Sequence, residues 1–240
     1  MWLINSSIGR KVVMAVTGIA LILFLTFHCT MNIVALFSGE AYNRICEMLG
    51  ANWYAVVATI GLAALAVCHI VFAFILTAQN RSARGESRYE VSTEVNNNGL
   101  LDVAERWASS NMLVLGLIIL CGLLLHLANF WYNMMFAEIV GMPTKLSPSD
   151  GFGWIQETFS NPVFAGLYLV WFCAIWFHLA HGFWSAMQTL GISGKIWQKR
   201  WNCIGLIYVT LLMLGFTVVV LSFAFGCAPS LCCQAGACGM

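Results

Sequence analysis

Charged side chains are scarce in this sequence. Asp, Glu, Lys and Arg make up 9% of its 240 residues, whereas about a quarter of the residues in a soluble domain are charged. The net charge is only +1, so the chain lacks the basic excess typical of nucleic-acid binding, and we expect no nucleic-acid partner. No internal repeat is evident. An ordinary soluble domain is therefore excluded.

The sequence contains long apolar stretches. Five of them have about 20 residues or more, the length that crosses a bilayer as a helix. Backbone polar groups find no water in hydrocarbon, so each stretch must be helical. No small-residue cleavage site follows the first stretch, so we do not expect a removable signal peptide. The sequence predicts an all-α bundle of five transmembrane helices at 12–37, 53–79, 108–136, 163–188 and 203–225. We expect residues 1–226 to form this single domain and 227–240 to be a Cys-rich tail.

The cations indicate an orientation. Nine of the eleven Lys and Arg residues flank the stretches on one side, and only Arg44 and Lys145 lie on the other. The positive-inside tendency puts the N-terminus and the loop 80–107 in the cytoplasm and the C-terminus outside. We expect a multi-pass protein of the bacterial cytoplasmic (inner) membrane. The nine cations are Arg10, Lys11, Arg81, Arg84, Arg88, Arg106, Lys195, Lys199 and Arg200.

Two connecting segments are long enough to have roles of their own. The cytoplasmic segment 80–110 carries mixed charge and is either a solvated connector or a docking surface for a soluble partner. The outer segment 138–162 is rich in Gly, Pro and Ser and is expected to form a lid over the outer face.

All five histidines fall within the apolar stretches. At about 1.5 Å of rise per residue, His28 and His126 come about 24 and 27 Å from the cytoplasmic ends of their helices. His69 and His178 both come at about 15 Å, and His181 at about 10 Å. The sequence therefore predicts two histidines at one level of the outer half and two at one level of the inner half.

Paired histidines on different helices suit a haem iron held by two imidazoles. Such a site has no open coordination position and favours electron transfer. The alternative for any one ring is a hydrogen bond inside the bundle, but ionisable residues at membrane depth are usually functional. Only His178 matches the level of His69, so we predict His178 as the ligand. His181 would lie at a haem edge, line a quinone pocket or make a packing contact.

Two motifs carry a resemblance to a known family. The stretch "SSIGRKVVMAVTGIALILFLTFHCTMN" (6–32) resembles the first helix of the di-haem cytochrome b membrane anchors of succinate:quinone and quinol:fumarate oxidoreductases. In that family a histidine deep in the helix is followed by an Asn, here His28 and Asn32. The stretch "FHLAHGFW" (177–184) resembles the family's "FH-x-x-x-G-x-W" segment, in which the first histidine is a ligand. The resemblance extends from Ser6 to about Phe225.

The resemblance implies a subunit of a succinate dehydrogenase or fumarate reductase complex, as in anaerobic respiration. Flavoprotein and iron–sulfur partners would bind its cytoplasmic face, and the active site for succinate and fumarate would lie on a partner. The anchor would hold two haem b groups, the distal one by His28 and His126 and the proximal one by His69 and His178. Electrons would pass between the iron–sulfur subunit and menaquinone or menaquinol, and the whole complex is a candidate dimer. The alternatives are the cytochrome b anchor of another respiratory complex, such as a nitrate reductase or a hydrogenase, and a haem-free proton-coupled transporter.

Quinol oxidation and haem propionates need polar partners. The outer loop offers Glu40, or alternatively Glu47, as a proton acceptor, although either is also explained as an interfacial charge. Candidate partners for the haem edge or propionates at the inner end are Ser7, Arg10, Lys11, Trp107 and Lys195. Positive-inside charge explains most of these residues without haem.

The ten cysteines match no metal pattern. Those within the apolar stretches are expected to act as small hydrophobic residues. They are Cys29, Cys68, Cys121 and Cys173. The tail contains Cys227, Cys232, Cys233 and Cys238, in a spacing unlike zinc or iron–sulfur sites, and is expected to be a variable end or to form disulfides outside the cytoplasm.

Overall fold

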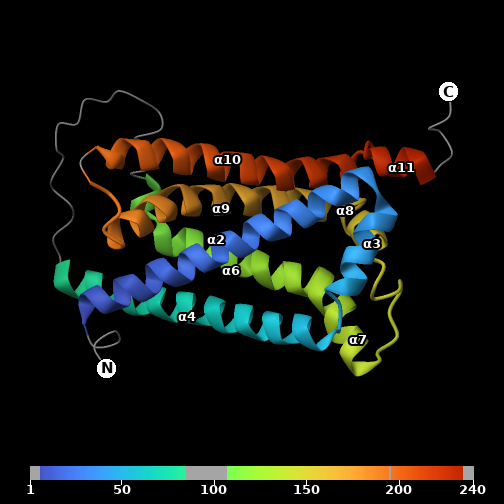
Figure 1. The fold of residues 1–240 in the computed structure, drawn as a ribbon, viewed down its shortest axis with the longest axis horizontal. Coiled ribbons are helices and arrows are strands. Elements are labelled where there is room, and N and C mark those ends of the chain that lie inside the picture. Colours follow the sequence, from blue (N-terminus) through green and yellow to red (C-terminus); the bar gives the residue numbers. More distant parts are fainter. Residues whose placement is uncertain (1–5, 85–106, 195, 235–240) are drawn as a thin grey trace.

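Every regular element in the described part of the chain is a helix. The computed structural model describes residues 6–84, 107–194 and 196–234. Figure 1 shows the long helices lying side by side along one axis. In chain order the elements are α2 (Ser7–Phe37), α3 (Gly39–Met48), α4 (Trp53–Arg84), α6 (Met112–His126), η1 (Leu127–Phe136), α7 (Ala137–Val140), α8 (Gly151–Phe159), α9 (Pro162–Thr189), α10 (Trp197–Ala224) and α11 (Pro229–Gln234).

Five helices are long and apolar enough to cross a membrane, as predicted. They cover Ser7–Phe37, Trp53–Ala83, Met112–Val140, Pro162–Thr189 and Trp197–Leu231. Several begin earlier or end later than the apolar stretches, because a helix can continue into polar sequence once its end is capped. At the start of α2, for example, the Ser6 hydroxyl accepts a hydrogen bond from Gly9 N at 2.9 Å, which satisfies one of the free N–H groups of the first turn.

Successive spanning helices run in opposite directions. α2 begins and α4 ends at one end of the bundle, and α3, α7 and α8 gather at the other end (Figure 1). We call the end with the short helices the capped end and the opposite end the uncapped end. α10 runs toward the capped end, and α11 follows it there, where Ser230 Oγ donates to Ala35 O at 2.8 Å. The first part of the Cys-rich tail is thus helical and docked on α2, and residues 235–240 lie outside the described residues.

The packed core lies on the side of α10. In the most apolar stretch of α10, 39% of the residues are buried, whereas the corresponding stretch of α4 contains none. α10 packs on α9 and α2, while α4 packs mainly on α2 and touches α6 little. A space is therefore left between α4 and the remaining helices, and it contains the site described below.

The capped end contains two helices that the sequence analysis treated as loop. The Asn43 amide of α3 donates to Asp150 Oδ1 at 2.8 Å, and its oxygen accepts from Phe152 N at 2.8 Å. Asp150 also caps α8 by accepting from Gly153 N at 3.0 Å. Within the predicted lid over 138–162, residues Gly151–Phe159 form α8, a helix tied to α3. Its apolar side chains, among them Phe152 and Ile155, are buried.

The third spanning helix is not an α-helix throughout. It changes to a π-helix over η1, directly after His126. A π-helix is rare, usually restricted to a single turn, and frequent at functional sites. The hydropathy pattern gave no sign of it, because an apolar stretch satisfies either hydrogen-bonding scheme.

The contact between α6 and α9 gives a test of the packing. A Cβ at Gly122 would lie 2.1 Å from Trp171 Cδ1, and the indole is held there because its Nε1 donates to Ile119 O at 3.0 Å. We expect Gly122→Ala to lower the free energy of unfolding by about 1–3 kcal/mol through overpacking. Thermal unfolding of the purified protein in detergent measures this.

Gly166 on α9 is the matched control. Nothing lies within 4 Å of a Cβ at this position, so Gly166→Ala should raise the free energy of unfolding by about 0.5–1 kcal/mol, as expected for a helix interior. Equal effects of the two substitutions would contradict the packing described here.

Candidate functional site

A cavity of about 1400 Å³ extends along the space between α4 and the other helices. Its walls come from α2, α4, α6, η1, α9 and α10, and α3 contributes at the capped end. Cavities for small molecules typically measure about 300–1,000 Å³, so this one has room for more than one such ligand. All five histidines line it: His28, His69, His126, His178 and His181.

One pair of histidines lies toward the capped end. His28 of α2 and His126, the last residue of α6, have ring centroids 5.7 Å apart and ring planes at 84°. Apolar aromatic rings surround the pair, so that water is excluded and few polar partners are available. These rings belong to Phe24, Phe130, Trp171 and Phe216.

A second pair lies farther toward the uncapped end. His69 of α4 and His178 of α9 have ring centroids 6.4 Å apart and ring planes at 65°. The residues that the sequence analysis grouped by level are therefore the residues that face each other. His181 lines the same cavity, but the ring that faces His69 is that of His178.

The spacing of the His69–His178 rings is the spacing expected of two imidazoles that share one metal ion, and the His28–His126 rings lie closer together. Metal–imidazole bonds are about 2.0–2.1 Å long and a ring nitrogen lies about 1.2 Å from its centroid, so two rings on opposite sides of an ion have centroids about 6.4 Å apart. The His69–His178 pair has this separation, and the His28–His126 pair is slightly closer. No group of three or more metal-binding side chains occurs in residues 6–84, 107–194 and 196–234. The donor set is thus two imidazoles at each level.

Buried nitrogens without partners also indicate a missing ligand. Among the described residues, Nδ1 of His178 and Nδ1 of His181 are buried and form no hydrogen bond. Buried polar atoms in native structures nearly always have a partner, and an exception calls for an explanation such as an absent group. Both atoms lie on rings that line the cavity.

The ring of His69 is oriented by a hydroxyl group. Thr17 Oγ1 lies 3.1 Å from His69 Nδ1, and the hydroxyl hydrogen is directed at Val13 O, 2.8 Å away. The threonine oxygen is therefore the acceptor and His69 Nδ1 the donor. With its hydrogen on Nδ1, the ring has its Nε2 lone pair available for a metal ion, and a hydrogen bond of this kind fixes the ring orientation in metal sites. Gly18 leaves room beside the ring, because a Cβ there would lie 3.3 Å from His69 Cε1.

The ring of His126 has a longer polar contact. Tyr168 OH lies 3.4 Å from His126 Nδ1 and also accepts from Asn129 Nδ2 at 3.4 Å. Tyr168 itself is buried. The two pairs therefore differ in their supporting groups, a short hydroxyl contact at one level and a longer phenol contact at the other.

Only some of the residues predicted to contact the haem edge or propionates at the inner end line the cavity. Lys11 lines it, together with Asn80 and Gln188, which the sequence analysis did not select. Ser7, Arg10 and Trp107 are not among its lining residues, and Trp107 packs edge-on against Phe177 instead. Lys195 lies outside the described residues.

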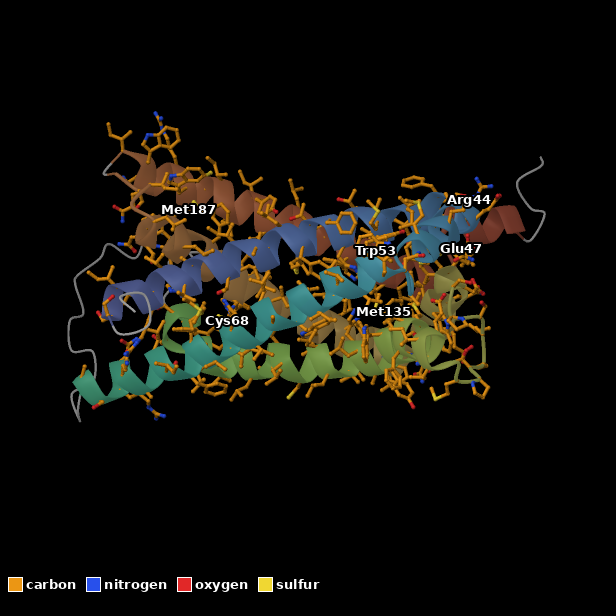
Figure 2. All side chains as sticks on the ribbon, turned by 60° about the horizontal axis from the view of Figure 1, so that its bottom comes forward. Arg44, Glu47, Trp53, Cys68, Met135 and Met187 are labelled. Carbon is orange, nitrogen blue, oxygen red and sulfur yellow. The ribbon has the colours of Figure 1, made fainter. Side chains whose placement is uncertain are left out.

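The predicted carboxylates lie away from the cavity. Glu40 pairs with Arg44 at 2.6 Å, and both side chains are at least 74% exposed. Figure 2 shows Arg44 and Glu47 on α3 at the extremity of the molecule, and Glu47 is exposed as well. Neither Glu40 nor Glu47 lines the cavity, whereas Glu138 does.

Glu138 was missed because its position in the sequence looks like that of any loop acid. Its carboxylate accepts from Ala51 N at 3.2 Å, a contact between segments 87 residues apart. The only signal in the sequence is an acid placed shortly after the third apolar stretch.

The cysteines of the spanning helices differ in burial: Cys29 is buried, Cys68 is partly buried, and Cys121 and Cys173 are exposed on the bundle surface. The Cys29 thiol donates to Leu212 O, and none of the cysteines from Cys29 to Cys227 forms a disulfide. Burial raises the pKa of the Cys46 thiol, on α3, to about 11. It is therefore protonated at neutral pH and is not a thiolate ligand.

The chain matches no protein family, no curated protein and no solved structure with which it was compared. Its function is therefore inferred from the residues of the cavity.

The Thr17–His69 contact gives a test of metal or haem binding at the second pair. Thr17→Val removes the acceptor of His69 Nδ1 and is expected to weaken binding at this level about 10–100-fold. Thr17→Ser keeps the hydroxyl and should bind like the wild type. Titration of haem into the haem-depleted protein, followed by absorbance, measures both. Equal affinity of the Val and wild-type proteins would show that the hydroxyl does not support the ring.

Proposed function

We propose that this protein is the di-haem membrane anchor of a succinate dehydrogenase or fumarate reductase complex. In this proposal it transfers electrons between menaquinone or menaquinol and an iron–sulfur subunit. The haem assignment rests on one observation: four histidine rings face each other in two pairs within one cavity. The assignment to this complex rests on the resemblance of the first and fourth spanning helices to the family.

Four side chains would hold the two groups. His28 and His126 would bind the haem toward the capped end, and His69 and His178 the other. Haem bound between two imidazoles exchanges single electrons at its iron and has no open position for a substrate. Thr17 orients one of the four rings, and the aromatic side chains around His28 and His126 exclude water from that level. Lys11 and Gln188 would face charged or polar edges at the uncapped end.

The proposed orientation puts the uncapped end in the cytoplasm. Cations are concentrated at that end, including Arg10 and Lys11 at the start of α2 and Lys199 and Arg200 on α10. The flavoprotein and iron–sulfur subunits would dock there, and the capped end with α3 and α8 would face the outside of a bacterial cytoplasmic membrane. This arrangement agrees with the positive-inside tendency.

Alanine substitution of the four histidines tests the haem assignment. We expect the wild type to contain two haems per chain and each of His28→Ala, His126→Ala, His69→Ala and His178→Ala to lose one, because each substitution removes one of the two imidazoles that would hold a haem. Pyridine haemochrome content and a reduced-minus-oxidised spectrum measure this.

Two results would contradict the assignment. Unchanged haem content in all four variants would exclude the pairs as ligands, and a wild type without a b-type band would favour the transporter alternative. Loss of haem in His181→Ala, with His178→Ala unaffected, would show that His181 is the ligand.

Purification from native membranes tests the proposed complex. The tagged chain, extracted in mild detergent, is expected to bring with it a flavin-containing subunit and an iron–sulfur subunit, and the complex should reduce fumarate with menaquinol. A complex that contains b haem and iron–sulfur clusters but no flavin would instead identify an anchor of another respiratory enzyme.

A further inference from the structure

A second, smaller cavity lies at the capped end, where η1, α8 and α9 meet. Its volume is about 340 Å³, which is within the range of small-molecule sites. It shares no lining residue with the cavity of the histidines. Most of its lining residues are polar, and none of them has a role in the proposed function.

Two side chains of the wall present hydrogen-bond acceptors to this cavity. The Asn133 amide nitrogen donates to Ala128 O and to Asn129 O, each at 3.0 Å. Both of its hydrogens are therefore engaged, and its oxygen is the atom that can bind a ligand. The Ser160 hydroxyl donates to Glu157 O at 3.0 Å, which leaves the lone pairs of its oxygen. A ligand that binds these two side chains must bring the hydrogens.

A carboxylate adds negative charge to these acceptors. Glu157 lines the cavity, and its Oε1 pairs with Lys145 Nζ at 2.5 Å. The two side chains are 46% and 65% exposed, and ion pairs this accessible to water contribute little to stability. The second carboxylate oxygen, Oε2, can accept from a positively charged ligand while Oε1 keeps its contact with Lys145.

The same region also offers donors. Asn161 lines the cavity, and its Oδ1 caps α9 by accepting from Val163 N at 2.9 Å. Its amide nitrogen is therefore the group that can bind a ligand. Lys145 adds N–H donors beside Glu157, because its ammonium carries three hydrogens. Positive and negative charge thus adjoin at the cavity, and a ligand that matches both is a zwitterion.

The position of the cavity indicates a membrane lipid. Its wall includes Asn133 of the third spanning segment and Phe164 in the first turn of α9. On the same helix, Val163 and Leu167 are 65% and 48% exposed, so an apolar surface continues from the cavity along α9. Trp154 completes the wall, as aromatic residues commonly do at the membrane interface. A head group in the cavity would leave its acyl chains on this apolar surface.

We propose that the small cavity binds the head group of phosphatidylethanolamine. The primary ammonium of this lipid donates three hydrogen bonds, and its acceptors are Asn133 Oδ1, Ser160 Oγ and Glu157 Oε2. The phosphate, joined to the ammonium by two carbons, accepts from Asn161 and Lys145. Hydrogen bonds with a charged partner are stronger than those between neutral groups. The inference goes beyond the proposed function, because it needs the chain to span a membrane but not to hold haem.

The acceptors of the cavity distinguish phosphatidylethanolamine from phosphatidylcholine. The two lipids have the same phosphate, glycerol and acyl chains. The choline nitrogen carries three methyl groups and no hydrogen, so it cannot donate to Asn133 or Ser160. A comparison of the two lipids therefore tests the recognition of the ammonium itself.

Native mass spectrometry of the full-length protein, purified in detergent, measures the affinity for each lipid. We expect dioleoyl phosphatidylethanolamine to bind about 10-fold more tightly than dioleoyl phosphatidylcholine, as the loss of hydrogen bonds from a charged group predicts. Lipid held only by the apolar surface of the bundle binds equally well with either head group. Phosphoethanolamine, the free head group, should compete weakly, because it lacks the acyl chains that pack on α9.

Variants of the wall test the assignment of the ammonium site. Glu157→Gln removes the charge of a half-exposed side chain and should weaken binding of the ethanolamine lipid about 10-fold, with no change for the choline lipid. Asn133→Leu removes an acceptor on η1 and should act in the same direction. Gln156→Ala, an exposed neighbour on α8 that does not line the cavity, is the matched control and should bind like the wild type.

Three results would overturn the inference. They are equal affinity of the wild type for the two lipids, an undiminished preference for the ethanolamine lipid in Glu157→Gln, and binding of phosphoethanolamine as tight as that of the lipid. The last result would identify a site for a water-soluble zwitterion. If the purified chain holds no haem, the proposed function fails, whereas the lipid measurement still decides this inference because it uses no haem signal.

Discussion

Imidazole rings placed deep within helices long and apolar enough to cross a membrane are a strong constraint on this structure. An unpartnered polar ring at this depth is costly, and here four rings face one another in two pairs across a cavity. The helices around the pairs are not equally well packed. α9 and α10 pack into a dense core, while α4 packs chiefly on α2, and the central stretch of α4 contains no buried residue. The open space beside α4 is therefore a property of the fold, and all five histidines line it.

The groups around the pairs differ in a way that has chemical consequences. His69 is held by a threonine hydroxyl at 3.1 Å, whereas His126 has a buried phenol at 3.4 Å. In the proposed di-haem anchor, the stronger hydrogen bond would make the His69 imidazole the more basic ligand. The π-helix after His126 contains Asn129, whose amide donates to this phenol, so the two levels differ in the polar groups that support their rings.

The capped end illustrates how short helices complete a membrane bundle. Asn43 of α3 donates to Asp150 and accepts from Phe152 N of α8, and the apolar face of α8 packs onto the ends of the spanning helices. The sequence over this region is rich in Gly, Pro and Ser and predicted only a lid. The helix within it could not be recognised from composition, because its stability comes from burial of Phe152 and Ile155 against partners far away in the chain.

Hydropathy and spacing alone determined the fold class and the levels of the histidines. A stretch of about 20 apolar residues has to be a helix in a bilayer, and a fixed rise per residue converts sequence position into depth. His69 and His178 were matched in this way before their rings were seen to face each other. Tertiary structure alone decided which polar groups reach the cavities. Thr17 contacts His69 and Glu138 lines the cavity of the histidines, whereas Glu40 and Glu47 remain exposed. Rotation about each helix axis and the path of each loop depend on long-range packing, which no local pattern records.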